Sequence, residues 1–220
     1  MKPALFLIIP LSITVFFLIR AEFRKNSRQI YVFKPISTLL VIAVALLSFG
    51  EARMELTYTL GILIGLALSL GGDIALMFQT NPKAFMIGLV LFLLAHVAYA
   101  VMFTLLSGLD TIVWLAALAL LTLGVGIYRL FRGGLGTMKV PVIVYIVVIS
   151  VMVNQAFSTF SGSAFTRGQA WMIAIGAILF YISDVILAAN RFWKSFQYHR
   201  ISLAFYYAGQ FLIALAASYF

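Results

Sequence analysis

The chain of 220 residues contains no cysteine and little charge. Only 10% of its residues are Asp, Glu, Lys or Arg, whereas about a quarter are charged in an ordinary soluble domain. The absence of cysteine excludes disulfides, thiolate catalysis and cysteine-based metal sites. The scarcity of charge argues against a soluble enzyme, a disordered tail and a nucleic-acid-binding module, because 15 Lys and Arg and 6 Asp and Glu are too few to cover a water-exposed surface.

Hydrophobic residues make up 64% of the chain, and they are grouped in long runs. A bilayer core needs about 20 mostly apolar residues per helix. Eight such runs follow one another, at residues 3–19, 35–49, 57–78, 84–106, 111–131, 140–160, 169–189 and 201–219. The sequence therefore predicts an all-α, polytopic membrane bundle of eight transmembrane helices. The connections are too short for a further domain, so residues 1–220 are expected to form a single transmembrane domain.

Lysine and arginine are unevenly divided between the two sides of this bundle. Most of them fall in alternate connections, the first, third, fifth and seventh: Arg20, Arg24, Lys25, Arg28, Lys34, Lys83, Arg129, Arg132, Lys139, Arg191, Lys194 and Arg200. The other side holds only Lys2, Arg53 and Arg167. Because short loops rich in Lys and Arg stay cytoplasmic, we expect an integral protein of a bacterial-type cytoplasmic membrane with both termini outside.

Two of the acidic residues lie inside predicted helices. Asp73 and Asp184 fall about one and a half turns before the cytoplasmic ends of the third and seventh helices. Carboxylates are costly in lipid and usually face a bundle interior or a wet cavity where function requires them. The alternative is a structural aspartate that a neighbouring hydroxyl or amide satisfies. The other acids lie in connections, where solvation explains them: Glu22, Glu51, Glu55 and Asp110.

Further polar residues are expected close to these two aspartates. They are Lys34 at the start of the second helix, Tyr145, Ser183, Tyr206, Tyr207 and Gln210, and, somewhat deeper, His96 and Tyr99. Each has an ordinary explanation when taken singly, because lysines snorkel, tyrosines form interfacial belts and a lone histidine often packs in a core. Their common depth indicates one polar site on the cytoplasmic side.

The two halves of the chain, 1–110 and 111–220, show signs of an internal repeat. Asp73 and Asp184 are 111 residues apart. The same offset relates three further polar pairs: Lys34 with Tyr145, His96 with Tyr207, and Tyr99 with Gln210. Four helices separate the equivalents, so both copies point the same way and a pseudo-twofold axis along the membrane normal relates them. This 4+4 parallel repeat predicts that the two carboxylates lie opposite each other.

Five segments carry a recognisable set of motifs. They are Lys34-Pro35, GGDIAL at 71–76, FLLAHVAY at 92–99, GAILFYISDVILA at 176–188 and YYAGQFLI at 206–213. In this order, over nearly the whole chain, they resemble the YhhN-like lysoplasmalogenase family of eight-span membrane hydrolases. The resemblance implies cleavage of the vinyl ether bond of a lysoplasmalogen, a lysophospholipid taken from the membrane, to a fatty aldehyde and glycerophosphocholine or glycerophosphoethanolamine.

Hydrolysis of a vinyl ether needs an acid that protonates the alkenyl carbon and an anion that stabilises the oxocarbenium ion, roles that two carboxyl groups divide in glycosidases. We expect Asp73 and Asp184 to share the catalytic roles, in an order that the sequence leaves open. The residues expected to orient the carboxyls or the water are His96, Tyr99, Tyr207 and Gln210, and those completing the substrate site are Tyr145, Ser183 and Tyr206. Lys34, alone or with Arg129 or Arg132, is expected to hold the phosphate. The scheme requires no metal or other cofactor.

Two other functional classes stay open at this point. A proton-coupled small-molecule or lipid transporter also uses intramembrane aspartates and repeats, although no proline interrupts the middle of a predicted helix as in many carriers. A lipid-binding scaffold would hold both aspartates for structural reasons alone. The sequence leaves the oligomeric state undetermined.

Overall fold

The computed structural model describes residues 2–78, 80–108, 113–196 and 199–220. These residues form eight long helices: α1 (Ile8–Phe23), α2 (Ser27–Leu47), α3 (Leu56–Leu76), α4 (Pro82–Ser107), α5 (Trp114–Phe131), α6 (Lys139–Ser158), α7 (Arg167–Phe192) and α8 (Ser202–Ala216). With the short 3-10 segments that adjoin some of them, all eight are long and apolar enough to cross a membrane. The predicted all-helical fold with eight spans is confirmed. Asp110 and the division of the chain at residues 110 and 111 lie outside the described residues.

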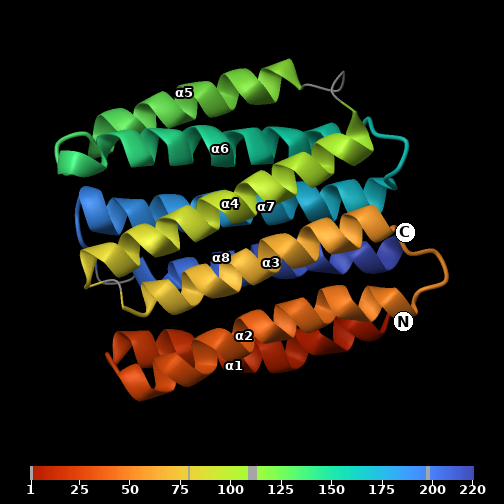
Figure 1. Cartoon of the computed structure of the whole chain (residues 1–220), viewed down its shortest axis with the longest axis horizontal. Coiled ribbons are helices and arrows are strands. Elements are labelled where there is room, and N and C mark those ends of the chain that lie inside the picture. The colour runs from red at the N-terminus through yellow and green to blue at the C-terminus, as the bar shows by residue number, and fades with distance from the viewer. Residues whose placement is uncertain (1, 79, 109–112, 197–198) are drawn as a thin grey trace.

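The helices lie side by side with their axes roughly parallel (Figure 1). α1 and α2 form one edge of the bundle and α5 and α6 the opposite edge, with the other four between them. α3 packs most extensively on α4 and α7 on α8, while α2 also reaches α8 and α4 also reaches α6. Both chain termini lie at the same end of the bundle (Figure 1).

Glycines allow the closest helix pairs to approach. A Cβ atom on Gly176 of α7 would lie 2.8 Å from the carbonyl oxygen of Gly209 in α8, so neither helix tolerates a larger residue at this crossing. Gly65 of α3 likewise leaves the space that the ring of Tyr99 in α4 occupies. Membrane helices pack closely through such small residues because lipid provides little hydrophobic drive for their association. The close packing brings the polar residues of α3, α4, α7 and α8 into one bundle interior.

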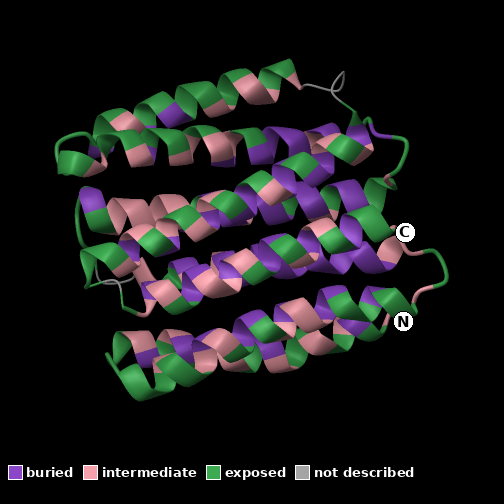
Figure 2. Ribbon diagram, viewed as in Figure 1, coloured by how far each residue is buried: buried purple, intermediate pink, exposed green. Residues whose placement is uncertain are grey.

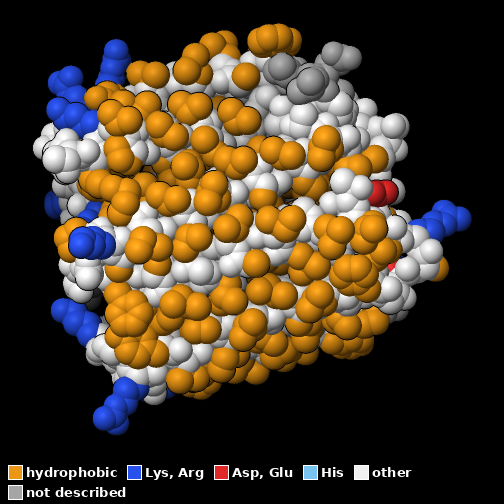
Figure 3. Space-filling view, in the orientation of Figure 1, with side chains coloured by type: hydrophobic (Ala, Val, Ile, Leu, Met, Phe, Trp, Pro, Cys, Tyr) orange, Lys and Arg blue, Asp and Glu red, His pale blue; other side chains and the backbone are white. Residues whose placement is uncertain are grey.

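The helices differ in how far they are buried (Figure 2). In the most apolar 18-residue stretch of the span that contains α8, 67% of the residues are buried, against 17% in α5. The visible face of the molecule is covered by hydrophobic side chains, and most of the Lys and Arg on view gather at one end (Figure 3). We call this the basic end; it carries Arg24, Lys83, Arg132, Lys139 and Lys194. The side of the membrane that it faces stays a prediction.

The second helix starts earlier than the apolar run at 35–49 predicted. α2 begins at Ser27, where the side chain of Asn26 caps the helix by accepting a hydrogen bond from the backbone N–H of Gln29 at 3.2 Å. Hydropathy missed these first two turns because they contain polar residues. The prediction that Lys34 lies at the helix start is therefore wrong: it lies about two turns inside α2 and is buried.

Pro35, expected at the start of the second span, lies inside α2 because the helix begins eight residues earlier, but it does not interrupt the helix. The proline removes one backbone donor. Beside it, the hydroxyl of Ser37 donates to the carbonyl oxygen of Phe33 at 2.8 Å. Membrane helices tolerate proline through such side-chain hydrogen bonds, because an unpaired backbone group is costly in lipid. α2 thus continues through the proline and carries Lys34 and Thr38 into the bundle.

Candidate functional site

Asp73 lies in the last turns of α3, surrounded by donors from α2 and α8. Thr38 donates a hydrogen bond to its Oδ2 at 2.6 Å, and Tyr206 donates to the same oxygen at 2.8 Å. The Nζ atom of Lys34 is 3.5 Å from Oδ1. The side chains of this ion pair are only 7% and 3% exposed. Asp73 is thus a buried carboxyl with one cation and two hydroxyl donors.

Asp184 lies in α7 and has fewer partners. Tyr145 of α6 donates a hydrogen bond to its Oδ2 at 2.6 Å. Nε2 of His96, in α4, is 3.6 Å from the same oxygen, and no hydrogen bond from a described residue occupies this nitrogen. The side chain of Asp184 is 15% exposed, whereas that of His96 is fully buried. Among the described residues no lysine or arginine nitrogen comes within 4.0 Å of this carboxyl, in contrast to Asp73.

The two aspartates line the same small cavity. Its volume is about 40 Å³, and Lys34, Ser183 and Tyr206 also line it. A buried water needs about 10–15 Å³ of such space and several polar partners. The cavity therefore has room for a few water molecules in contact with both carboxyls.

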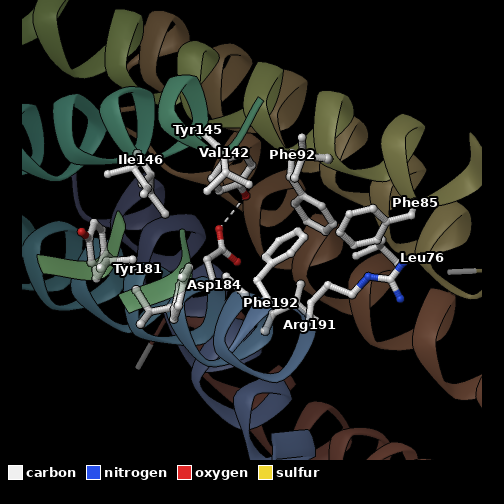
Figure 4. Close-up of a pocket in the computed structure, with 17 residues that line it drawn as sticks. Leu76, Phe85, Phe92, Val142, Tyr145, Ile146, Tyr181, Asp184, Arg191 and Phe192 are labelled. Atoms are coloured by element: carbon white, nitrogen blue, oxygen red, sulfur yellow. Dashed lines mark hydrogen bonds between the residues drawn. The ribbon is translucent and has the colours of Figure 1, made fainter. Parts of the chain in front are cut away.

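Asp184 also lines a second, mainly apolar cavity of about 70 Å³ between α3, α4, α5, α6 and α7 (Figure 4). Leu76 and Phe92 line both cavities, so the two adjoin. In Figure 4 the carboxyl of Asp184 points towards Tyr145, with Arg191 and Phe85 on one side of it and Ile146 on the other. The polar and apolar cavities thus meet at Asp184.

Tyr99 and Gln210, which were expected to orient the carboxyls or the water, contact neither aspartate. Tyr99 donates a hydrogen bond to Oε1 of Gln210 at 2.7 Å, and Nε2 of Gln210 donates to Ser69 at 3.0 Å. This pair lines neither of the two cavities that contain an aspartate. They bind each other across α4 and α8.

The other predicted residues lie around the aspartates, although their roles stay predictions. Tyr207 donates to the backbone oxygen of Lys34 at 3.0 Å and so supports α2 rather than a carboxyl directly. Lys34 faces Asp73 instead of a headgroup. Arg129 and Arg132 are exposed and line neither cavity that contains an aspartate.

The acidic residues in the connections are less solvated than predicted. Glu22 lies inside α1, its side chain is 9% exposed, and its Oε2 is 3.2 Å from Nε of Arg200. The prediction that Glu22 is solvated in a loop is wrong, because α1 extends further than its apolar run. At the opposite end Glu51 pairs with Lys2 at 2.6 Å, and the side chain of Glu55 accepts a hydrogen bond at the start of α3.

Sequence reasoning missed two residues of the site. Thr38 is four residues after Lys34, and this spacing puts both on one helical face once α2 is known to include them. Arg191 is seven residues after Asp184, two turns along the same face, and it lines the apolar cavity. From the sequence, Arg191 was only one of the cations that indicate the cytoplasmic side, since nothing there showed which loop cation borders a cavity.

Several contacts agree with the predicted repeat. Tyr99 and Gln210, which bind each other, are separated by the repeat offset of 111 residues. The pairs Lys34–Asp73 and Tyr145–Asp184 occupy equivalent positions in the two halves. These contacts support the repeat, which stays a prediction. Within the described ranges no three His, Cys, Asp or Glu side chains gather as a metal site.

The comparisons with known proteins concern nearly the whole chain. Residues 29–217 match the YhhN family. The chain is 29% identical over 196 residues, 88% of its length, to a protein of Escherichia coli O6:H1 named "Uncharacterized membrane protein YhhN", 89% of which is covered. No solved structure gives a significant match.

Relatives with a named activity are also similar. The bovine protein "Lysoplasmalogenase TMEM86A" is 31% identical over 163 residues, which cover 71% of this chain and 64% of that protein. The human protein of the same name is 31% identical over 159 residues, with the same coverage. The family match spans α2 to α8 and includes both aspartates and their partners, so this chain belongs to the YhhN family.

Proposed function

We propose that this membrane protein is a lysoplasmalogenase-like hydrolase, which cleaves the vinyl ether bond of a lysoplasmalogen to a fatty aldehyde and a glycerophospho-alcohol. The observation that carries the proposal is a pair of intramembrane carboxyls that line one small cavity but differ in their ion-pair and hydrogen-bond partners. Its relatives named lysoplasmalogenase support the same reaction class. By the positive-inside rule we expect the site to open to the cytoplasmic leaflet.

The partners assign different roles to the two carboxyls. Asp73 has a lysine and two hydroxyl donors, an arrangement that favours a buried carboxylate, since charge is tolerated in low dielectric when it is paired and hydrogen-bonded. Asp184 receives one described hydrogen bond and lines a mainly apolar cavity, an environment that favours the neutral acid. We therefore assign the proton donor to Asp184 and the stabilising anion to Asp73.

The reaction balances with one water and no redox step. The carboxyl of Asp184 transfers its proton to the alkenyl carbon that is not bonded to oxygen, and the double-bond electrons form the new C–H bond. The adjacent carbon becomes an oxocarbenium ion, which the carboxylate of Asp73 stabilises electrostatically. Water adds to that carbon and returns a proton to Asp184. The resulting hemiacetal then collapses: its O–H proton passes to the glycerol oxygen as the C–O bond to glycerol breaks, which gives an aldehyde and a free glycerol hydroxyl.

The remaining cavity residues hold water and keep the carboxyls in position. Ser183 lines the cavity beside both aspartates. His96 lines neither cavity, but its buried Nε2 lies 3.6 Å from the carboxyl of Asp184 and helps to keep that carboxyl in position. Tyr145 fixes Asp184 towards α6, while Lys34 and Thr38 fix Asp73 towards α2. The two carboxyls thus act on one water-filled space from different helices.

The test is a product assay on the purified protein in detergent. Lysolipids with a vinyl ether, an alkyl ether or an ester at the same position are supplied, and products are identified by mass spectrometry in ¹⁸O-labelled water. We expect aldehyde release from the vinyl ether alone, with label at the aldehyde oxygen measured before it exchanges with the solvent. Asp73→Asn and Asp184→Asn should both lose turnover.

Glu55→Gln is the matched control, because it removes a carboxylate outside the cavity and keeps a side-chain oxygen for the start of α3. Full activity of either aspartate variant would remove that residue from the mechanism. Lipid or small-molecule flux in proteoliposomes without any product would favour the transporter instead.

A further inference from the structure

Arg191 is a cation at the basic end that forms no ion pair with a described carboxylate. It lies in the last turns of α7, two turns beyond Asp184 on the same helical face, about 10 Å along the axis. Its guanidinium carbon is 4.8 Å from the centroid of the Phe85 ring, a cation–π contact that holds the head group at the edge of the apolar cavity. Arg191 and Asp184 therefore border the same cavity.

The other cations near the aspartates are already paired. Lys34 faces Asp73, and Arg200 faces Glu22. Among the described residues no carboxylate lies within 4.0 Å of Arg191, which is exposed. Arg191 is thus the cavity cation that can bind an external anion without breaking an internal ion pair.

An apolar path leads away from Asp184 on the side opposite Arg191. Ile146 of α6 lines both the apolar cavity of Asp184 and a mainly apolar groove between α5 and α6, so the two spaces adjoin at Ile146. This groove extends along α6 to Gln155, and Gly124 of α5 faces it. From Val142 to Gln155 the path follows about 20 Å of α6. One cation, one carboxyl and a long apolar path therefore lie in this order along the helices.

We propose that Arg191 binds the phosphate of a single-chain lysophospholipid whose alkenyl chain lies in the groove between α5 and α6. The proposal rests on the proposed function and names how that site holds its substrate. The seven bonds from phosphorus to the protonated carbon extend about 8 Å, which is comparable to the rise of about 10 Å along α7 between Asp184 and Arg191. Phosphate on the guanidinium thus places the double bond at Asp184 and the chain among apolar side chains.

The geometry also separates the roles of the two cations of the site. Lys34 acts on Asp73, so its loss should lower kcat. Arg191 contacts a part of the substrate that does not change during the reaction, so its loss should raise KM and leave kcat nearly unchanged. The assignment replaces the sequence-based expectation that Lys34, with Arg129 or Arg132, holds the phosphate.

Binding is measured first, with ligands that cannot turn over. A 1-O-alkyl lysophosphatidylcholine has no double bond to protonate, and the matching 1-O-alkylglycerol lacks the phosphate. We expect Arg191→Gln to weaken binding of the phospholipid about tenfold or more, as loss of a charge-assisted contact does, and to leave binding of the alkylglycerol unchanged. Arg191→Lys should lie between wild type and Arg191→Gln, and Lys194→Gln, at an exposed cation of the same end, should match wild type.

Two outcomes would overturn the proposal. If Arg191→Gln binds each ligand as tightly as wild type does, Arg191 does not contact the phosphate. If the substitution weakens binding of the phospholipid and of the alkylglycerol by the same factor, its effect is only structural. Glycerophosphocholine, which lacks the chain, should bind far more weakly than the intact lipid, and equal binding would exclude the chain groove. Because these measurements need no turnover, they distinguish failure of this proposal from failure of the hydrolase assignment, which the product assay tests.

Discussion

Asp73 and Asp184 occupy equivalent positions in the predicted repeat, yet their surroundings differ in kind. Where the first half provides Lys34 against Asp73, the second half provides Tyr145 against Asp184. The side chain of Asp73 is 3% exposed and has a lysine and two hydroxyl donors, whereas that of Asp184 is 15% exposed and also borders an apolar cavity. The difference teaches that two identical residues can have unlike surroundings, and the proposed division of acid and anion between the two carboxyls rests on it.

The largest expected effect is on kcat, and its rescue by a small acid should differ between the two aspartates. Asp184→Asn removes the proposed proton donor and should lower kcat by about 10²–10⁴-fold, the contribution of a positioned acid. Both carboxyls line the small shared cavity, but only Asp184 also borders the larger apolar cavity and is 15% exposed. Added formate should therefore restore more of the activity of Asp184→Ala than of Asp73→Ala. Aldehyde release in single-turnover assays measures both. Rescue of Asp73→Ala alone would reverse the assignment.

The next effect concerns stability. Lys34→Met leaves the carboxylate of Asp73 buried without its cation and should destabilise the fold by about 3–5 kcal/mol. The double variant Lys34→Met/Asp73→Asn removes both charges and should recover most of that loss without recovering activity. Thermal unfolding in detergent measures the series, with Lys194→Met at an exposed position as control. A Lys34→Met protein as stable as wild type would show that Asp73 is not charged.

A smaller effect compares the two tyrosines that donate to the aspartates. Tyr206→Phe removes a hydrogen bond to a proposed carboxylate, and Tyr145→Phe removes one to a proposed neutral acid. Hydrogen bonds to charged groups contribute about 1.5–3 kcal/mol and neutral ones about 0.5–1.5 kcal/mol. Tyr206→Phe should therefore cost more free energy of unfolding than Tyr145→Phe. The opposite order would contradict the proposed charge states.

The smallest effect tests whether the alkenyl chain of the substrate lies in the groove that adjoins the cavity of Asp184. Ile146→Trp fills the position that the cavity and the groove share. We expect a several-fold lower kcat/KM for a 16-carbon vinyl ether and no change for an 8-carbon one, on the scale of pocket discrimination among methylene groups. Val144→Trp, at a neighbouring exposed position that lines neither space, is the control. Equal loss for both chain lengths would argue against a chain in this groove.

Hydropathy predicted the number of helices correctly, because each span had to bury about 20 apolar residues in lipid. It placed the start of α2 wrongly, since the cap at Asn26 and the turns before Pro35 are polar. That error hid Thr38, whose position relative to Lys34 becomes apparent only when both lie on one helix. Polarity at a common depth identified Asp73, Asp184, Tyr145 and Tyr206 as neighbours.

Common depth did not show which polar residues would bind each other. Tyr99 and Gln210 were predicted at the carboxyls but form their own hydrogen bond. Arg191 was interpreted only as a topology signal, because a loop cation that snorkels and one that borders a cavity look the same in sequence. Rotation of each helix about its axis decides between these outcomes, and helix packing sets that rotation.

Scarcity of charge and the length of the apolar runs determined that this chain is a membrane bundle with two exceptional aspartates, since the cost of charge in lipid acts on every residue independently of its neighbours. The partners of those aspartates were decided by packing alone. Tyr206 donates to Asp73 although 133 residues separate them in sequence. Lys34 of α2 lies beside Asp73, and His96 of α4 lies beside Asp184. The distinct surroundings of the two carboxyls therefore arise only when the eight helices assemble.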